Sequence, residues 1–120
     1  MIRPFQETRV FESQPEPVEI ALYDILWADG SYDGAQHLTR LHLADRVVIC
    51  QKPFVNLRPM FGDAFLFCLT NGAVNQLRIR SFEAESIVLD NGETLTVSSF
   101  LAEKFREKYC RYLASLVWED

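Results

Sequence analysis

The strongest constraint on the fold is a β-hairpin signal in the last third of the chain. Residues 86–89 (Ser-Ile-Val-Leu) and 94–97 (Thr-Leu-Thr-Val) are two short runs rich in β-branched residues. Asp90-Asn91-Gly92-Glu93 lies between them, and an Asn-Gly pair readily supplies the positive φ angles that a tight hairpin turn needs. The sequence therefore predicts two antiparallel strands joined at Asn91-Gly92.

An amphipathic helix is predicted to follow this hairpin directly. Ser98 or Ser99 can cap it, because a serine hydroxyl accepts a hydrogen bond from the backbone N–H groups left free in the first turn. One apolar stripe then recurs at helical spacing, formed by Leu101, Phe105, Tyr109, Tyr112 and Leu116. Because such a stripe is excluded from water, we expect the helix to pack on the sheet and to close the domain.

Shorter strand signals precede the hairpin. Strands are expected at residues 9–12, 18–20, 25–28, 37–43, 46–50, 64–69 and 77–82. Residues 29–34 are dense in turn-forming residues and are expected to be a loop, and residues 52–61 are expected to hold a short helix that Gly62 ends. The predicted fold class is mainly β with short helices (α+β), closed by the C-terminal helix.

Length and charge bound the domain organisation. A chain of 120 residues fits a single domain with a real core. We expect residues 1–17 to form an N-terminal arm or linker remnant that can include a strand, and residues 18–117 to form the domain. The net charge is −5, but residues 34–118 carry ten bases and eight acids. This weakly basic body is compatible with DNA, although it lacks the concentrated basic face that strong phosphate binding prefers.

Several functional classes find no support in the sequence. Cys50, Cys68 and Cys110 are widely spaced and odd in number, which argues against a disulfide framework or a zinc site; each is expected to be a buried, reduced thiol. No apolar run is long enough to span a bilayer, and no secretory signal is present, so we expect a cytoplasmic protein. His37 and His42 have no further metal ligands grouped with them, and no glycine-rich phosphate loop or nucleophile elbow occurs. We therefore expect no enzyme activity, no metal and no cofactor.

Three groups of residues, in this order along the chain, resemble the motifs of the LytTR-type DNA-binding domain. Asp24–Asp29 is similar to the family's early motif, an Asp-Ile followed by an aromatic residue and an acid. Phe65–Cys68, followed by Val74-Asn75 and then Ile79, is similar to its central motif. Ile87–Ser98 is similar to its closing hairpin and serine. The order and the gaps agree over most of the chain.

The resemblance implies a fold and a function. The family has an elongated β-β-β arrangement with small flanking helices, and it binds DNA through loops rather than through a recognition helix. A member would be a transcription regulator that binds duplex DNA at direct-repeat sites, pairs there as a homodimer, and works behind a receiver domain, as in a response regulator, or behind another signalling partner.

The resemblance also points to candidate contact residues, and these depart from the family pattern. The family usually places an arginine, a histidine, a basic residue and a serine where this chain has Phe67, Leu69, Thr70 and Asn71, and an arginine where it has Ser99. The expected DNA contacts are the loops around Gln36-His37, Thr70-Asn71 and Ser98-Ser99. What remains in these loops is uncharged but can still donate hydrogen bonds to phosphates or base edges.

Two arginines are the best candidates for phosphate contact outside these loops. Arg78 and Arg80 stand two residues apart in a predicted strand and would therefore share a face; either they bind phosphates or they serve only solubility. Lys52 is a further candidate. His37 is either a DNA-contacting donor or a solvated loop residue, and Asn75 either contacts a base or satisfies backbone groups where the strand is interrupted.

A second function remains open from the sequence. The acidic ends, the uncharged contact positions and Trp118 close to the C-terminus also suit a diverged LytTR-like fold that serves as a protein-interaction or dimerisation module without strong DNA binding.

Overall fold

Alternating apolar residues divide the chain into short strands, and these strands form three antiparallel sheets. The computed structural model describes residues 7–13, 16–62, 64–69 and 71–117. Strands β1 (Thr8–Phe11) and β2 (Val18–Ala21) pair as a two-stranded sheet. The 3-10 turn η2 (Leu22–Asp24) leads from β2 into the central sheet, so the early part of the chain is tied directly to the core of the molecule.

The central sheet has five strands in the order β5-β4-β3-β7-β6. Its members are β3 (Ile25–Asp33), β4 (Gln36–Leu43), β5 (Val47–Cys50), β6 (Phe65–Leu69) and β7 (Gly72–Asn75). The connection from β5 to β6 holds helix α1 (Phe54–Leu57) and the 3-10 turn η3 (Arg58–Met60), and Gly62 follows with φ +73°. The short helix predicted for residues 52–61 is therefore present as two single turns.

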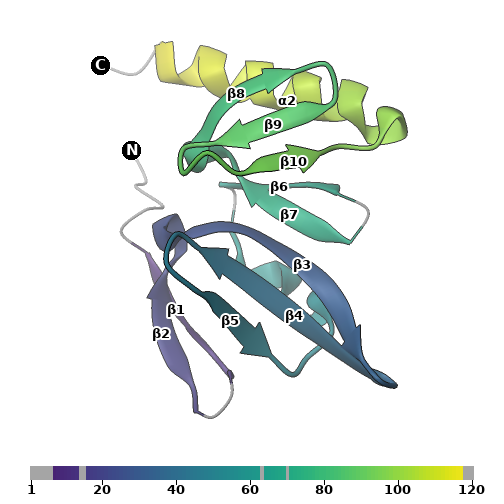
Figure 1. Cartoon of the computed structure of the whole chain (residues 1–120). Coiled ribbons are helices and arrows are strands. Elements are labelled where there is room, and N and C mark those ends of the chain that lie inside the picture. Colours follow the sequence, from purple (N-terminus) through teal and green to yellow (C-terminus); the bar gives the residue numbers. More distant parts are fainter. Residues whose placement is uncertain (1–6, 14–15, 63, 70, 118–120) are drawn as a thin grey trace.

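The upper part of the molecule is a three-stranded sheet covered by the long helix (Figure 1). The 3-10 turn η4 (Gln76–Arg78) leads into strands β8 (Ile79–Glu83), β9 (Ser86–Leu89) and β10 (Thr94–Thr96), which are ordered β10-β9-β8. Helix α2 (Ser99–Val117) follows directly. The predicted Asn-Gly hairpin and the closing helix are both confirmed, and the molecule is elongated, with extents of 42 × 32 × 24 Å.

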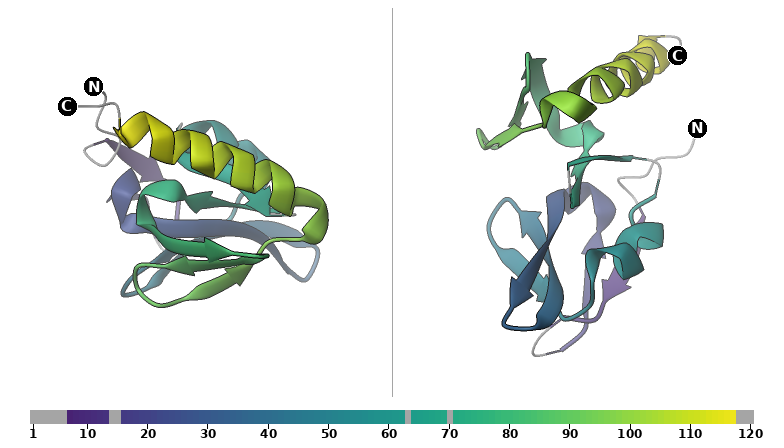
Figure 2. Two further views of the ribbon diagram at one scale, coloured as in Figure 1. Left: turned by 90° about the horizontal axis from the view of Figure 1, so that it is seen from above. Right: turned by 90° about the vertical axis from the view of Figure 1, so that its right-hand side faces the viewer.

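Two hydrophobic cores lie on opposite faces of the central sheet. Residues of β3 divide between them: Ile25 and Ala28 belong to the lower core with Phe11, and Leu26 belongs to the upper core with Phe105. The right-hand view of Figure 2 shows α2 and the three-stranded sheet at one end of the molecule and strands β1 to β5 towards the other. Leu101 and Tyr109 pack against the upper core beside Phe105, which confirms the predicted helical stripe there, while the side chain of Leu116 lies outside the described part. Each fully buried large apolar side chain is worth about 1.5–3 kcal/mol.

Two expectations about the central sheet were wrong. Residues 29–34 are not a loop, since β3 continues to Asp33 and pairs with β4 as far as Gln36. Gly30 lies within the strand because Asn71 packs on it; a Cβ at Gly30 would lie 2.9 Å from the Asn71 Cγ. Strand β7 was not predicted either, since only four small residues of it are present between the Asn-Gly break and η4.

The side chain of Asn75 connects the start of η4 with the segment between β2 and β3. It is fully buried, and its amide nitrogen lies 3.0–3.4 Å from the carbonyl oxygens of Leu22, Tyr23 and Ile25. Its side-chain oxygen accepts a hydrogen bond from the backbone N–H of Leu77 at 3.0 Å, which caps η4. The prediction that Asn75 satisfies backbone groups where a strand is interrupted is confirmed.

Candidate nucleic-acid interface

Three chain junctions lie along one edge of the elongated molecule, on the right-hand side of Figure 1. They are the β3–β4 hairpin, the start of β7 and the junction between β10 and α2. The described residues Gln36, His37, Asn71, Ser98 and Ser99 stand at these junctions, and all five are exposed. We call these five residues the loop edge. Thr70, which belongs to the same predicted set, lies outside the described residues.

The β3–β4 hairpin projects Gln36 and His37 beyond the sheet. Gly34 and Ala35 form its turn, and Gly34 has φ +61°, as a type II′ turn requires at its first central position. Tyr32 stands opposite His37 in the ladder, and the two ring centroids are 4.6 Å apart. The Tyr32 ring is 65% exposed, so the hairpin tip presents two aromatic faces and an amide to solvent.

Asn71 is fixed against the hairpin rather than left free in a turn. Its carbonyl oxygen accepts a hydrogen bond from the Gly30 N–H at 2.8 Å. A shallow hollow of about 330 Å³ opens between this position, the hairpin and α1. It is lined by Gly30, Ser31, Tyr32, His37, Leu38, Pro53, Phe54, Val55 and Asn71. Two of the predicted contact residues, His37 and Asn71, therefore share one concave surface with mixed polar and apolar walls.

Ser98 and Ser99 mark the start of α2. The Ser98 carbonyl accepts hydrogen bonds from the backbone N–H groups of Leu101 and Ala102, both at 2.9 Å, so Ser98 occupies the capping position at the helix start. Phe100 follows with 86% of its surface exposed. The serine hydroxyls and the first-turn N–H groups are neutral donors at a helix N-terminus, which favours a negative group nearby.

The paired placement predicted for Arg78 and Arg80 was wrong. Arg78 lies in η4 and not in a strand, and its guanidinium donates to both carboxylate oxygens of Asp90 and to the Tyr23 carbonyl. The hydrogen bond to Asp90 raises the pKa of Arg78 above its usual value. Arg80 lies in β8 with an exposed side chain. Lys52 forms a salt bridge with Glu12 at 2.9 Å.

A second ion cluster stabilises the base of the hairpin. Asp29 accepts hydrogen bonds from Arg40, at 3.1 Å to Nε, and is 2.8 Å from His42 Nε2. Burial by itself would raise the pKa of Asp29, but the hydrogen bonds with His42 and Arg40 outweigh it and lower that pKa below its usual value. The His42 ring stacks on Trp27 with centroids 3.8 Å apart. Arg40 is thereby neutralised beneath the loop edge.

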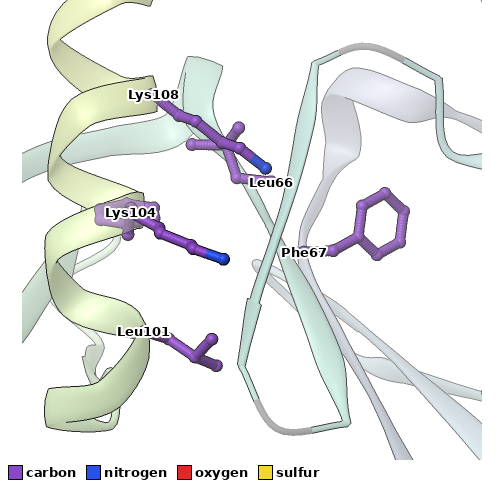
Figure 3. Close-up of a pocket in the computed structure, with 6 residues that line it drawn as sticks. Leu66, Phe67, Leu101, Lys104 and Lys108 are labelled. Atoms are coloured by element: carbon purple, nitrogen blue, oxygen red, sulfur yellow. The ribbon is translucent and has the colours of Figure 1, made fainter.

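Cations that the sequence analysis did not single out lie beside the edge strand β6. Lys104 and Lys108 line a narrow groove between α2 and β6 together with Leu66, Phe67, Leu101 and Phe105. Figure 3 shows both lysines reaching from the helix towards the strand. On the other side of β6, the Arg58 guanidinium lies 4.3 Å from the centre of the Phe67 ring. The signal in the sequence was the i, i+4 spacing of the lysines, which places them on one helical face.

The cysteines divide between the core and the surface. Cys50 is buried, and burial raises the pKa of its thiol to about 11. Cys110 is exposed on α2, so the expectation that it is buried was wrong. The side chain of Cys68 and the whole of Trp118 lie outside the described residues.

The described part of the chain holds neither a cluster of metal ligands nor a helix suited to cross a membrane. Residues 7–13, 16–62, 64–69 and 71–117 contain no group of three or more His, Cys, Asp or Glu side chains arranged to hold a metal ion. Over the same residues, no helix combines the length and the apolar character that crossing a membrane requires.

Comparison with known proteins agrees with this architecture at the level of the fold. No protein-family model and no curated protein matches the sequence. Among solved structures, a LytTR-type DNA-binding domain of a Bacillus cereus protein matches with a TM-score of 0.66 and 16% sequence identity, over 85% of this chain and 95% of the other. At this identity the likeness establishes shared architecture, and the fold of this chain is that of a LytTR-type domain.

Proposed function

We propose that this protein binds duplex DNA as a transcription regulator of LytTR type, with the loop edge facing the DNA. One observation carries the proposal: three junctions that are far apart in sequence lie along one edge of the fold, and each presents exposed hydrogen-bond donors there. A solved structure that shares the fold is a DNA-binding domain.

The chemistry of the loop edge suits the reading of bases better than the holding of phosphates. His37, Asn71 and Gln36 can donate to and accept from base edges, and a glutamine or asparagine amide pairs well with adenine in the major groove. The apolar wall of the hollow, where Tyr32 and Val55 are 65% and 68% exposed, suits contact with a thymine methyl group. In this proposal Thr70, Ser98 and Ser99 contact the sugar-phosphate backbone as neutral donors, and Arg80 adds a charge from β8.

Cellular context follows from the same proposal. The protein would act in the cytoplasm, bind direct-repeat sites as a pair of copies, and receive its signal from a receiver domain or another signalling partner. It would need neither a metal nor a catalytic group.

Selection from a pool of random duplexes at low salt tests the proposal. The expected result is an enriched sequence whose affinity falls steeply as salt rises, because phosphate contacts release counterions. The same selection carried out with the triple variant Gln36→Ala, His37→Ala and Asn71→Ala should enrich no common sequence. Failure of the wild-type protein to retain any duplex at low salt would refute the proposal.

A protein-interaction or dimerisation module is the second candidate, and exposed apolar residues favour it. Phe100, Val55 and Tyr32 are 86%, 68% and 65% exposed, and apolar groups of this kind are typical of protein interfaces. Light scattering distinguishes the two functions. A dimer that forms without DNA and is lost in Phe100→Ala supports the module, whereas a monomer that pairs only on DNA supports the regulator.

A further inference from the structure

We propose that the cationic rim of β6, formed by Lys104, Lys108 and Arg58, binds the phosphates of a DNA duplex whose bases meet the loop edge. The inference rests on the proposed function. It assigns the positive charge that phosphate binding needs, and that the loop edge lacks, to a surface outside the three loops. It concerns residues on α2 and η3 that stand at no position matched by the family motifs.

The pattern of salt bridges leaves these cations without carboxylate partners. Arg40, Lys52, Arg78 and Arg111 are each bound to an acidic side chain. Within the described residues, no salt bridge involves Lys104, Lys108 or Arg58. Among the described side chains of α2, Glu107 is the acid that forms a salt bridge, and its partner is Arg111. Among the described cations without a salt bridge, three lie together beside β6 (Arg58, Lys104 and Lys108), whereas Arg46, Arg80 and Arg106 are spread over the β4–β5 turn, β8 and α2.

The two lysines are placed together at a cost to the helix. They stand at i and i+4 on α2, point into the same groove (Figure 3) and are both exposed. Like charges at this spacing repel and destabilise a helix slightly. An anion held between the two lysines would remove that repulsion.

The size of the groove determines what kind of anion fits. Its volume is about 50 Å³, whereas sites that enclose a small organic ligand usually measure hundreds of Å³. Arg58 lies on the other side of β6, over the Phe67 ring that also lines the groove. An anion that engages all three cations must therefore be extended and carry repeated charges. The phosphate backbone of a duplex has both properties.

Helix α2 connects this rim to the loop edge. The helix begins at Ser99, and Lys104 and Lys108 stand five and nine residues further on. At 1.5 Å per residue they lie about 7.5 and 13.5 Å along the helix axis from the loop edge. A duplex seated on the loop edge could therefore place consecutive backbone phosphates within reach of both flexible side chains.

An acidic peptide added as a further strand to β6 is a less suitable occupant. β6 ends the order of the central sheet, so an edge is present within the described strands. However, its pairing with β7 changes register between Leu66 and Leu69, and irregular edges disfavour strand addition. Three of the apolar side chains that line the groove, Leu66, Leu101 and Phe105, also already pack in the upper core.

The experiment compares the salt dependence of duplex binding for the wild type and matched double variants. Lys104→Ala/Lys108→Ala should lower the slope of log affinity against log salt by about two units, since each phosphate contact contributes about 0.9. Between 50 and 200 mM salt the wild type should then lose about tenfold more affinity than the variant. The loss should be equal for the selected sequence and for unrelated duplexes, and Lys104→Arg/Lys108→Arg should retain the wild-type slope.

Arg9→Ala/Arg46→Ala is the matched control. It removes the same formal charge from β1, where Arg9 is paired with Glu7 at 2.7 Å, and from the β4–β5 turn, on the opposite side of Figure 1, and should leave the slope unchanged. Thermal unfolding of every variant verifies folding. A wild-type slope in Lys104→Ala/Lys108→Ala, or an equal change in the control pair, would overturn the inference while the proposed function stands. If the wild type binds no duplex, both fall. The inference would also be overturned if Lys104→Ala/Lys108→Ala lost the ability to bind an acidic peptide while its affinity for duplex DNA stayed at the wild-type level.

Discussion

The loop edge and the cationic rim of β6 lie close together on this protein but differ in chemistry. The five residues of the loop edge are uncharged or imidazole side chains, whereas the rim of β6 consists of two lysines and an arginine without salt bridges to described residues. Base reading depends on the geometry of donors and acceptors, and backbone attraction depends on charge. The difference suggests that this chain separates selectivity from electrostatic affinity, which one set of loop residues could otherwise combine.

The separation is compatible with an acidic protein. The net charge is −5, and five of the eleven described lysines and arginines are neutralised by salt bridges, as Arg78 is by Asp90 and Arg40 by Asp29. Total charge therefore says little about the local field. The arrangement of ion pairs decides where an anion can bind.

The largest expected effect comes from removing the side chain of Asn75, because both regions depend on its hydrogen bonds. Asn75→Ala should lower the free energy of unfolding by about 2–4 kcal/mol, because it leaves buried carbonyls of the β2–β3 connection and the Leu77 N–H without their partner. Chemical denaturation measures the loss. Asn56→Ala, at an exposed position, is a control expected to change stability by less than about 0.5 kcal/mol. A change in the free energy of unfolding below about 1 kcal/mol for Asn75→Ala would show that these hydrogen bonds contribute little to stability.

A second prediction removes selectivity and leaves charge unchanged. His37→Ala and Asn71→Ala should each reduce discrimination between the selected duplex and its single-base variants by about 1–3 kcal/mol. Their salt slopes should match the wild type, since neither change removes a fixed cation. Fluorescence anisotropy on both duplexes at several salt concentrations measures the two quantities separately. A reduced slope with unchanged discrimination would reverse the roles assigned to the two regions.

Short-range patterns in the sequence were sufficient to predict the strands and the helix in which they occur. The Asn91-Gly92 turn and the stripe through Leu101, Phe105 and Tyr109 predicted the upper sheet and its helix, and both are present. Asn75 was recognised as a backbone partner because its position interrupts a strand. The hairpin, the helical stripe and the capping of η4 by Asn75 depend on neighbours in sequence, which a single sequence can reveal, whereas the Asn75 amide donates to carbonyls 50–53 residues away.

Features that depend on tertiary contacts were missed. Gly30 and Asp29 have turn-forming propensity, but cross-strand pairs with β4 and the packing of Asn71 hold them in β3. Arg78 has a strand-like spacing from Arg80, but Asp90, twelve residues away, binds it. The cationic rim combines α2 with η3 across β6, so only the folded chain brings its members together.

A third prediction weakens the support of the loop edge by changing pH. Asp29 has a lowered pKa in the folded state, so its ion pairs stabilise the fold above its unfolded pKa of about 3.9 and lose that effect as pH falls through the lower folded value. Asp29→Asn should cost about 1–2 kcal/mol at pH 7, with part of the gain discounted because Arg40 is 41% exposed. It should also reduce the decline in stability below about pH 4. Denaturation across pH measures both effects.

That result also tests the independence of the two regions. Asp29 lies in β3 next to Gly30, which donates to the Asn71 carbonyl, so Asp29→Asn should weaken base discrimination and leave the salt slope unchanged. Asp33→Asn, an exposed acid at the hairpin tip, is the control for the loss of one negative charge. An equal loss of discrimination in both variants would attribute the effect to charge and not to the ion cluster.

The smallest expected effect comes from returning a cation to the loop edge. Ser99→Arg should steepen the salt slope by about one unit, which corresponds to a three- to fourfold larger loss of affinity between 50 and 200 mM salt. It should also destabilise α2 by about 0.3–1 kcal/mol, because a cation near a helix N-terminus opposes the helix dipole. Ser99→Gln has similar reach without charge and is the matched control. Because Ser99 and Lys104 are separated by more than one helical turn, the gain in slope should be the same in the Lys104→Ala/Lys108→Ala background. A gain that appears only when both lysines are present would show that the two regions hold one continuous stretch of backbone and act as a unit.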